Sequence, residues 1–338
     1  MVDPSTAAPL IYIHGMGHFH PDNVIDNGFL EELDIGTSND WIMDRVGIRS
    51  RRTVLDLDYI RETRNQDVRA AAEASMYSNR ETGKFAAEKA LKAANVGADQ
   101  IGMVIAGGCS PDTVTPAEAC SIAAALGIDA TAFDLNSACS SFAVQMHFLS
   151  QMRPEALPEF VLLISPENNT RTIDYNDRST AVLWGDGTSA AVVSTRVPSA
   201  VSACFSSMTS QPAGWDKVVI PRMGHFVQEG LTVQTFAIKR STRCFRALQE
   251  QTQRKDLHFI GHQANKRMLE SVCARCDISD QHHYFNVDQY GNTGAAGAPI
   301  VLSQRWNDFS AGDQLAMVVV GSGLTWSGLA ISFGARDD

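Results

Sequence analysis

The sequence predicts a layered α/β fold, and three features of the chain lead to this prediction. Its 338 residues are 44% apolar and 20% charged, which suits a large buried core and excludes a disordered or low-complexity protein. Segments with strand character alternate with segments of helical periodicity in both halves of the chain. Two strand-to-helix junctions, at 135–140 and 259–265, carry reactive side chains, which suggests a duplicated unit.

In the first half, apolar patterns and helix-ending residues define the expected elements. A helix is expected to open at Ser38, whose hydroxyl can accept from a free N–H of the first turn, and another to stop at Gly127. The Gly-Asp-Gly sequence at 185–187 predicts a turn between paired strands. Residues 50–81 are polar and aperiodic, which predicts a surface excursion. The expected strands are 9–14, 101–106, 130–135, 161–164, 181–183 and 189–194, and the expected helices are 38–47, 82–94, 116–126 and 139–150.

The second half begins near residue 200 and repeats the alternation of strands and helices. The clearest feature of this half is a strand that is followed directly by a helix near Gln263. The expected helices are 232–251, one beginning at 263, and 293–306, and the expected strands are 257–260, 315–320 and 326–333. We therefore divide the chain into an N-terminal half, 1–198, and a C-terminal half, 199–338.

Composition and charge exclude several classes of protein. The net charge of −10 argues against broad binding to nucleic acid or to anionic membranes. No apolar run reaches the roughly 18 residues of a membrane span. The seven cysteines are scattered and odd in number, so a disulfide framework is not expected, and the first residues show no secretory signal. These observations together predict a cytosolic protein.

Cys139 is the first candidate for chemistry. A strand ends before it, small residues turn the chain, and a helix begins at the cysteine. A thiol in that place faces unpaired backbone N–H groups and the positive end of the helix dipole, which both favour the nucleophilic thiolate. The alternative is a small apolar cysteine buried in the core.

Three further segments carry candidate side chains, and each has an ordinary structural explanation. His262 lies where a strand hands over to a helix, and it could equally be a capping or core histidine. Asn292 lies in a turn flanked by glycines, where asparagine is usually structural. Gly321-Ser-Gly323 forms a turn between two strands that lets backbone approach a ligand closely.

Other candidate sites are weaker. Cys273-Ala-Arg-Cys276 is a single C-x-x-C pattern without a second pair at zinc spacing. His14, His18 and His20 alternate imperfectly, and metal binding there is equally weakly supported. The chain has no G-x-S-x-G, G-x-G-x-x-G or G-x-x-x-x-G-K-[ST] motif.

Several motifs in order carry a resemblance to a known family. They are the cysteine segment, His262-Gln-Ala-Asn, Tyr290-Gly-Asn-Thr, Trp184-Gly-Asp-Gly, Gly323-Leu-Thr-Trp and the N-terminal segment 36–52. In order and spacing they resemble the thiolase-superfamily condensing enzymes, specifically β-ketoacyl-acyl-carrier-protein synthase III, over nearly the whole chain. The resemblance implies a thiolase-like duplicated α-β-α-β-α fold and a homodimer, with no metal or redox cofactor.

The resemblance also implies a reaction and a Cys139-His262-Asn292 triad. Cys139 would take the acyl group of a short acyl-CoA, and malonyl-acyl-carrier protein would then lose carbon dioxide. The resulting enolate would be stabilised by His262 and Asn292 and would attack the acyl group, which initiates fatty-acid synthesis. The backbone N–H of Cys139 and that of Ser322 or Gly323 would stabilise the oxyanion.

Binding residues follow from the same resemblance. Trp41 would stack on the adenine of CoA, Arg178 would cover its other face, and Arg45 would meet phosphate. Lys266 and Arg267 would lie near the tunnel mouth, with Arg267 matching an arginine linked to carrier-protein docking. The plain alternatives are a solvated basic surface for Arg45 and exposed helix charges for Lys266 and Arg267.

Three departures from the family pattern leave the primer and even the second substrate open. Ser322 replaces a usual glycine and could narrow the site. Thr115 stands where the family often has an aromatic residue that reaches the partner subunit, and the segment 63–80 is longer than usual. The alternatives are a related acyltransferase or condensing enzyme with another acceptor, a Cys-His-Asn thioesterase, and a catalytically silent carrier-binding protein, against which the intact triad argues.

Overall fold

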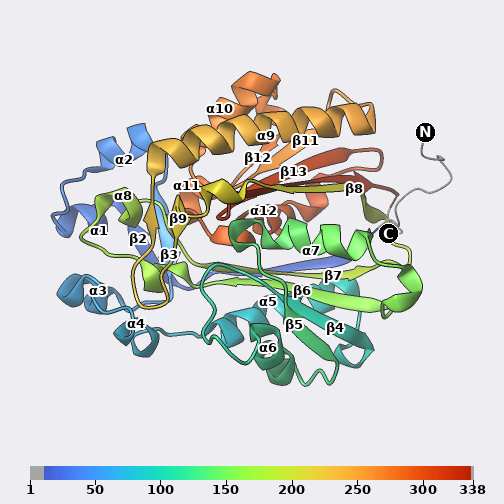
Figure 1. The fold of residues 1–338 in the computed structure, drawn as a ribbon, viewed down its shortest axis with the longest axis horizontal. Helices are drawn as coiled ribbons and strands as arrows, with labels where there is room; N and C mark the ends of the chain where they lie inside the picture. The colour runs from blue at the N-terminus through green and yellow to red at the C-terminus, as the bar shows by residue number, and fades with distance from the viewer. Residues whose placement is uncertain (1–10, 336–338) are drawn as a thin grey trace.

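A ten-stranded sheet runs through the computed structural model, which describes residues 11–335 (Figure 1). The strand order is β12-β11-β13-β14-β8-β1-β7-β6-β4-β5. Within the described residues, β1 and β8 pair through Ile11 with Ala203 and Tyr12 with Ser202, and this short seam joins two five-stranded halves. The strands are β1 Ile11–Phe19, β4 Ile101–Ala106, β5 Thr131–Asp134, β6 Phe160–Glu167 and β7 Gly187–Ser194 in one half, and β8 Val201–Ser210, β11 His258–Gly261, β12 His283–Tyr284, β13 Gln314–Gly321 and β14 Thr325–Phe333 in the other.

The two halves have the same topology. Numbered along the chain within each half, the strands lie side by side in the order third, second, fourth, fifth, first. In both halves the first three of this row are parallel, and the last two are antiparallel to their neighbours. The expected duplication is therefore confirmed. The predicted boundary after residue 198 lies in the connection between β7 and β8, and the division into two domains stays a prediction.

Helices form three layers around the two half-sheets (Figure 1). The middle layer holds α7 (Ser141–Ser150) and α12 (Gly297–Gln304), whose apolar side chains join those of both half-sheets in one core. On the outer faces, α5 (Asn79–Ala94) and α6 (Glu118–Leu126) cover the N-terminal half, and α9 (Gly230–Thr252) and α10 (Lys266–Cys276) cover the C-terminal half. The resulting α-β-α-β-α arrangement is the predicted fold class.

Helix ends follow local side-chain chemistry at two predicted positions and at the start of α5, which lies before the predicted residue 82. The Ser38 side chain accepts from Trp41 N at the start of α2 (Asn39–Arg45). Ser78 and Glu81 form a reciprocal capping box at the start of α5. Gly127 ends α6 with a φ of +70°, a conformation that suits glycine.

Two expectations were wrong, and a third extends past the described residues. Residues 181–183 form no strand, since α8 (Arg178–Ala181) ends there and the backbone of Leu183 instead accepts from Asn292. Residues 50–81 are structured: β3 (Ser50–Thr53) pairs with β2 (Asn23–Asp26), and α3 (Leu57–Thr63) and α4 (Ala70–Glu73) follow. The expected strand 9–14 is β1, but residues 9 and 10 lie outside the described residues. The remaining short elements are α1 Asn27–Glu32, β9 Val218–Val219, β10 Val227–Gln228 and α11 Val287–Tyr290.

The order in residues 50–81 depends on a buried arginine. Arg51 is fully buried, and its guanidinium donates to Asn27 Oδ1 at 2.6 Å and to the Val182 carbonyl. These bonds compensate for the loss of water around the charge and tie the excursion to the segment before Trp184. Within residues 11–335, no helix combines the length and apolar character needed to cross a membrane.

Candidate active site

One cavity brings the three predicted catalytic residues together. It has a volume of about 390 Å³, and Cys139, His262 and Asn292 all line it. Trp41 and Arg45 also line this cavity, although they lie more than 90 residues before the cysteine along the chain. The fold therefore gathers side chains from both halves around a single sulfur.

A sharp turn places Cys139 at the start of the middle helical layer. After β5, Ala138 adopts a φ of +47°, which is uncommon for a residue with a side chain. The Asn136 side chain accepts from Ala138 N at 2.7 Å and holds this turn. Cys139 follows in a short 3₁₀ turn, Ala138–Ser140, which leads directly into α7. Its side chain is 8% exposed, so the sulfur lies in a nearly dry pocket.

The surroundings of Cys139 favour its thiolate. The contact between the Cys109 and Cys139 sulfurs, in which either atom could be the donor, is the largest influence, and it lowers the pKa of Cys139 against the opposing effect of burial. Hydrogen bonding with His262 lowers it further, and the pKa falls to about 5. The N-terminal end of α7 adds a favourable dipole. At neutral pH the sulfur is therefore a ready nucleophile.

His262 is held at the end of β11 by its neighbour in sequence. Gln263 donates to the Gly261 carbonyl at 2.7 Å, and its Oε1 accepts from Asn286 N and Val287 N at 3.1 and 3.2 Å. These bonds tie the histidine to the segment that leads to Asn292. Within the described residues, His262 Nδ1 is buried without a hydrogen-bond partner, so the ring is placed by its backbone rather than by a carboxylate.

Backbone bonds on both sides position Asn292. Its N–H donates to the Leu183 carbonyl at 2.8 Å, and its carbonyl accepts from Gly185 N at 3.1 Å. Its Oδ1 accepts from Gly294 N at 3.0 Å, which orients the side-chain amide. The Nδ2 group is thereby left as the donor of this side chain for a ligand in the cavity.

The Gly-Asp-Gly segment supports Asn292. A Cβ at Gly185 would lie 2.1 Å from the Tyr290 carbonyl oxygen. The backbone segments around Gly185 and Tyr290 can therefore approach closely only because residue 185 is glycine. Asp186, which looked like a simple turn residue, is fully buried and accepts from Val54 N and Thr170 N, both at 2.8 Å. Burial raises the pKa of Asp186 to about 6.

The Gly-rich turn after β13 reaches the same cavity. Ser322 lines the cavity, whereas Gly323 is not among the residues that line it. The Ser322 hydroxyl donates to the Val218 carbonyl at 2.5 Å, so this side chain ties the turn to β9. Which of the two backbone N–H groups, that of Ser322 or that of Gly323, would serve as the oxyanion donor stays a prediction.

Two of the side chains predicted to bind CoA, Trp41 and Arg45, line the cavity, and Arg178 contacts Trp41 without lining it. The Arg178 guanidinium carbon is 4.9 Å from the centre of the Trp41 ring, and Arg178 also donates to the Gly36 carbonyl. An aromatic ring between the two would require about 7 Å, so they stack on each other in this structure. Arg45 lines the cavity with an exposed side chain, and its guanidinium is 4.0 Å from the Asp44 carboxylate.

Lys266 and Arg267 begin α10 beside the cavity but do not line it. The Lys266 ammonium lies 5.0 Å from the centre of the Phe285 ring. Arg267 donates to the Asp44 and Met43 carbonyls, both at 3.0 Å, and pairs with Glu270. Arg267 therefore holds the end of α2 in addition to any role on the surface.

Two residues beside the predicted nucleophile were missed by the sequence reasoning. Cys109 follows β4, and its sulfur is 3.5 Å from that of Cys139. Glu167 ends β6, is fully buried, and accepts from Cys109 N at 2.9 Å and from Ala295 N at 2.6 Å. Both residues follow expected strands. Their position at the carboxyl ends of neighbouring parallel strands was the signal that could have identified them.

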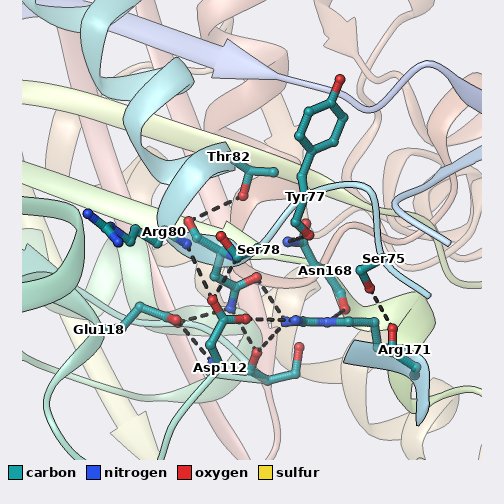
Figure 2. Close-up of polar contacts among 12 residues, drawn as sticks. Ser75, Tyr77, Ser78, Arg80, Thr82, Asp112, Glu118, Asn168 and Arg171 are labelled. Carbon is teal, nitrogen blue, oxygen red and sulfur yellow. Dashed lines mark hydrogen bonds and ion pairs between the residues drawn. The ribbon is translucent and has the colours of Figure 1, made fainter. Parts of the chain in front are cut away.

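A polar network anchors the loop that follows Cys109 (Figure 2). The Asp112 carboxylate pairs with Arg171 at 2.7 Å and accepts from Asn79 N at 2.8 Å. Glu118 accepts from Asp112 N and from Asn79 Nδ2, both at 3.0 Å. Burial raises the pKa of Glu118 to about 7. These bonds fix the loop to the start of α5.

The weaker candidates have other partners. His14 contacts the Val197 carbonyl at 3.1 Å, His18 the Ser303 hydroxyl at 2.8 Å, and His20 the Asp186 carbonyl at 3.0 Å. Cys273 and Cys276 lie on α10 itself and are buried in the core that α9 and α10 share with the C-terminal half-sheet. No group of three or more His, Cys, Asp or Glu side chains suited to a metal ion occurs between residues 11 and 335.

Comparison with known proteins identifies the family. The family model for 3-oxoacyl-[acyl-carrier-protein] synthase III matches residues 133–211, and the model for its C-terminal part matches residues 249–333. A β-ketoacyl-[acyl-carrier-protein] synthase III of Clostridium botulinum (strain Okra) is 30% identical over 342 residues, which cover 95% of this chain and 98% of that protein. The chain belongs to the β-ketoacyl-[acyl-carrier-protein] synthase III family. This membership confirms the resemblance and makes the protein an acyltransferase.

Solved structures of synthase III enzymes agree with this assignment. The enzyme of Aquifex aeolicus superposes with a TM-score of 0.85 at 27% identity, over 96% of this chain and 100% of that chain. The enzyme of Pseudomonas aeruginosa gives a TM-score of 0.83 at 26% identity, over 97% and 100%. The thiolase-type fold is thus shared along almost the whole synthase III chain.

Proposed function

We propose that this protein condenses the acyl group of a short acyl-CoA with malonyl-acyl-carrier protein and so initiates fatty-acid synthesis. The observation that carries the proposal is the meeting of Cys139, His262 and Asn292 at one cavity. The synthase III relatives, which cover nearly the whole chain, support the same reaction.

The first half-reaction loads the cysteine. The Cys139 thiolate attacks the thioester carbon of acyl-CoA, a tetrahedral intermediate forms, and CoA leaves as a thiolate. The backbone N–H groups of Cys139 and Ser322 stabilise the negative oxygen of that intermediate. Nearly complete burial of the sulfur limits hydrolysis of the acyl-enzyme.

The second half-reaction forms the carbon–carbon bond. Malonyl-acyl-carrier protein enters, the malonyl group loses carbon dioxide, and the remaining electron pair is held as an enolate. His262 Nε2–H and Asn292 Nδ2–H donate to the enolate oxygen without adding net charge to a dry pocket. The carbanion attacks the acyl carbon, and the Cys139 thiolate leaves. This chemistry uses no metal and no redox cofactor.

The same proposal assigns roles at the mouth of the cavity. Arg178 moves off the Trp41 ring when the adenine of CoA stacks there, and Arg45 meets phosphate. Lys266 and Arg267 attract the acidic carrier protein, and Lys266 has the freer head group because Arg267 also holds α2.

We also propose a cytosolic homodimer joined at β5. This strand is the outermost of its half-sheet, and Phe133 on it is 39% exposed. An open strand edge is a template for pairing with a second copy. All seven cysteines are free, which suits the cytosol. Light scattering that gives the mass of a monomer would contradict the dimer.

A mass measurement tests the proposed function. Incubation with acetyl-CoA is expected to add one acetyl group to the intact protein, and the adduct should vanish in Cys139→Ala but persist in Cys120→Ala, which changes an exposed cysteine. Malonyl-acyl-carrier protein should then release carbon dioxide and give a β-ketoacyl product. An adduct without condensation would indicate another acceptor, and turnover to free acid alone would indicate a thioesterase. No adduct with any acyl-CoA would contradict the transferase.

A further inference from the structure

We propose that Cys109 is a second catalytic thiol, whose S–H group donates a hydrogen bond to the Cys139 sulfur and stabilises its thiolate. The proposal rests on the proposed function, since it takes Cys139 as the nucleophile. It gives a role to a side chain that borders the reacting atom and has no part in the acyl transfer described above.

The geometry places the two thiols in direct contact. The two sulfur atoms are 3.5 Å apart, within hydrogen-bonding range for sulfur. Both residues line a second cavity of about 220 Å³, which shares Cys139, Trp184 and Ser322 with the first. Because Cys109 follows β4 and Cys139 follows the parallel neighbour β5, the two side chains meet at one edge of the sheet.

The surroundings decide which sulfur keeps the proton. The titratable groups that face this pair are His262, on the side of Cys139, and Glu167, which also hydrogen-bonds the Cys109 side chain and whose own pKa is raised to about 8 by burial and by Cys139. Hydrogen bonding to Cys139, burial and the carboxyl group of Glu167 raise the pKa of Cys109, while Cys109 and His262 lower that of Cys139. The proton therefore stays on Cys109, and the negative charge stays on Cys139.

Several bonds prevent Cys109 from turning away. Glu167 accepts from its backbone N–H at 2.9 Å, and the next residue, Ser110, donates to Asn169 Oδ1 at 2.7 Å. A Cβ at Gly108 would lie 2.8 Å from the Pro166 carbonyl oxygen, so this loop packs directly on β6. The polar network of Figure 2 holds the chain that follows. A fixed donor needs little reorganisation when charge appears on the neighbouring sulfur.

The hydrogen bond changes strength during the reaction. When the thiolate forms its bond to the acyl carbon, the sulfur loses its charge and becomes a weak acceptor. When the enolate displaces it, the carbon–sulfur bond breaks, the electron pair returns to Cys139, and the Cys109 S–H group stabilises the departing thiolate. The proton remains on Cys109 throughout, so no further reactant is needed.

Alkylation of Cys139 tests this proposal without any acyl substrate. The rate of Cys139 modification by iodoacetamide, followed by peptide mass spectrometry, gives the pH midpoint of its thiolate. Loss of one hydrogen bond to a charged group should raise this midpoint by about 1 to 2 pH units in Cys109→Ala. Cys109→Ser retains a donor and should keep most of the low midpoint. Cys204→Ala, at an exposed cysteine, is the matched control and should match the wild type.

An unchanged midpoint in Cys109→Ala, or equal shifts in the alanine and serine variants, would overturn the proposal. If Cys109→Ala does not fold, Cys109→Val keeps the volume of the side chain without a donor, and the same shift is expected. A shifted midpoint in a protein that no acyl-CoA loads would contradict the proposed function and leave this inference standing. Normal loading and condensation with an unchanged midpoint in Cys109→Ala would support the proposed function and contradict the role of Cys109.

Discussion

Replacing Asn292 by aspartate tests the division of labour between the two half-reactions. The aspartate has nearly the same shape and keeps an oxygen to accept from Gly294 N, which is 3.0 Å from Asn292 Oδ1. The change replaces the free N–H₂ group by an oxygen that carries or shares a negative charge. The enolate therefore loses a donor and gains a repulsive neighbour, while the loop geometry is retained.

The size of the effect follows from the number of donors. With His262 and Asn292 as the two donors to the enolate, removal of one costs about 10²- to 10³-fold in rate, as for other oxyanion sites. Attack by Cys139 on acyl-CoA relies on backbone donors instead, so loading should fall by less than about 10-fold. Asn292→Ala also removes the donor but adds no negative charge, so it should lower the rate of decarboxylation by this roughly 10²- to 10³-fold alone.

Two assays separate these steps. Rapid quenching and intact mass measure acetyl loading from acetyl-CoA, and release of labelled carbon dioxide from malonyl-acyl-carrier protein measures decarboxylation. Asn176→Ala, at an exposed asparagine, is the control and should leave both rates unchanged. Equal losses of loading and decarboxylation in the Asn292 variants would refute the assignment of Asn292 to the enolate.

Three further predictions concern Trp41 at the cavity, Glu118 in the polar network of Figure 2, and Gly185 beside Tyr290. Trp41→Ala should raise KM for acyl-CoA by roughly 5- to 150-fold, since base stacking contributes about 1–3 kcal/mol, and leave loading from an acyl-pantetheine without nucleotide unchanged. Burial raises the pKa of Glu118 to about 7 from its usual 4.5, so its contribution to stability is full below pH 4.5 and is lost as pH rises through 7. In urea unfolding, the free energy of unfolding of the wild type should fall by about 2 to 3 kcal/mol between pH 5 and pH 8 through this group, and Glu118→Gln should not show this fall. In Gly185→Ala the new Cβ would lie 2.1 Å from the Tyr290 carbonyl oxygen, so the melting temperature should drop and condensation should be lost. In the control Gly312→Ala the new Cβ has no atom within 4 Å, so the φ of +95° at residue 312 should lower the melting temperature while condensation is retained.

The sequence predicted the elements whose signals are local. The continuous apolar run at 101–106 and the strand, turn and helix around Cys139 were placed correctly, because each signal lies within a few residues. The helix start at Ser38 depends on a single hydroxyl and was also correct. The family resemblance then supplied what local patterns could not, namely which of the scattered histidines and asparagines meet the sulfur.

The errors arose where distant backbone decides the structure. Residues 181–183 are apolar and looked like a strand, but Leu183 bonds to Asn292 and Arg51 bonds to Val182 from segments that no local pattern connects to them. Arg51 lies in residues 50–81, which the sequence predicted to be a surface excursion. A fully buried guanidinium is recognised only once its acceptors, Asn27 and Val182, are brought beside it by the fold.

The duplicated topology explains why four functional side chains meet at one place. The second strand of each half is β4 or β11, and Cys109 and His262 follow these equivalent strands. The third strand is β5 or β12, and Cys139 and the segment leading to Asn292 follow those. The two junctions that suggested a duplication are therefore not each other's equivalents.

This correspondence means that the two halves of the molecule contribute side chains to the site from equivalent positions in the fold. Each half supplies one side chain after its second strand and one before its middle-layer helix, α7 or α12. Since Cys109 occupies the position that corresponds to His262, the thiolate of Cys139 receives a donor from the same place in each half of the fold. A donor after β4 is therefore as much a part of this architecture as the histidine after β11, and removal of either should raise the pKa of Cys139.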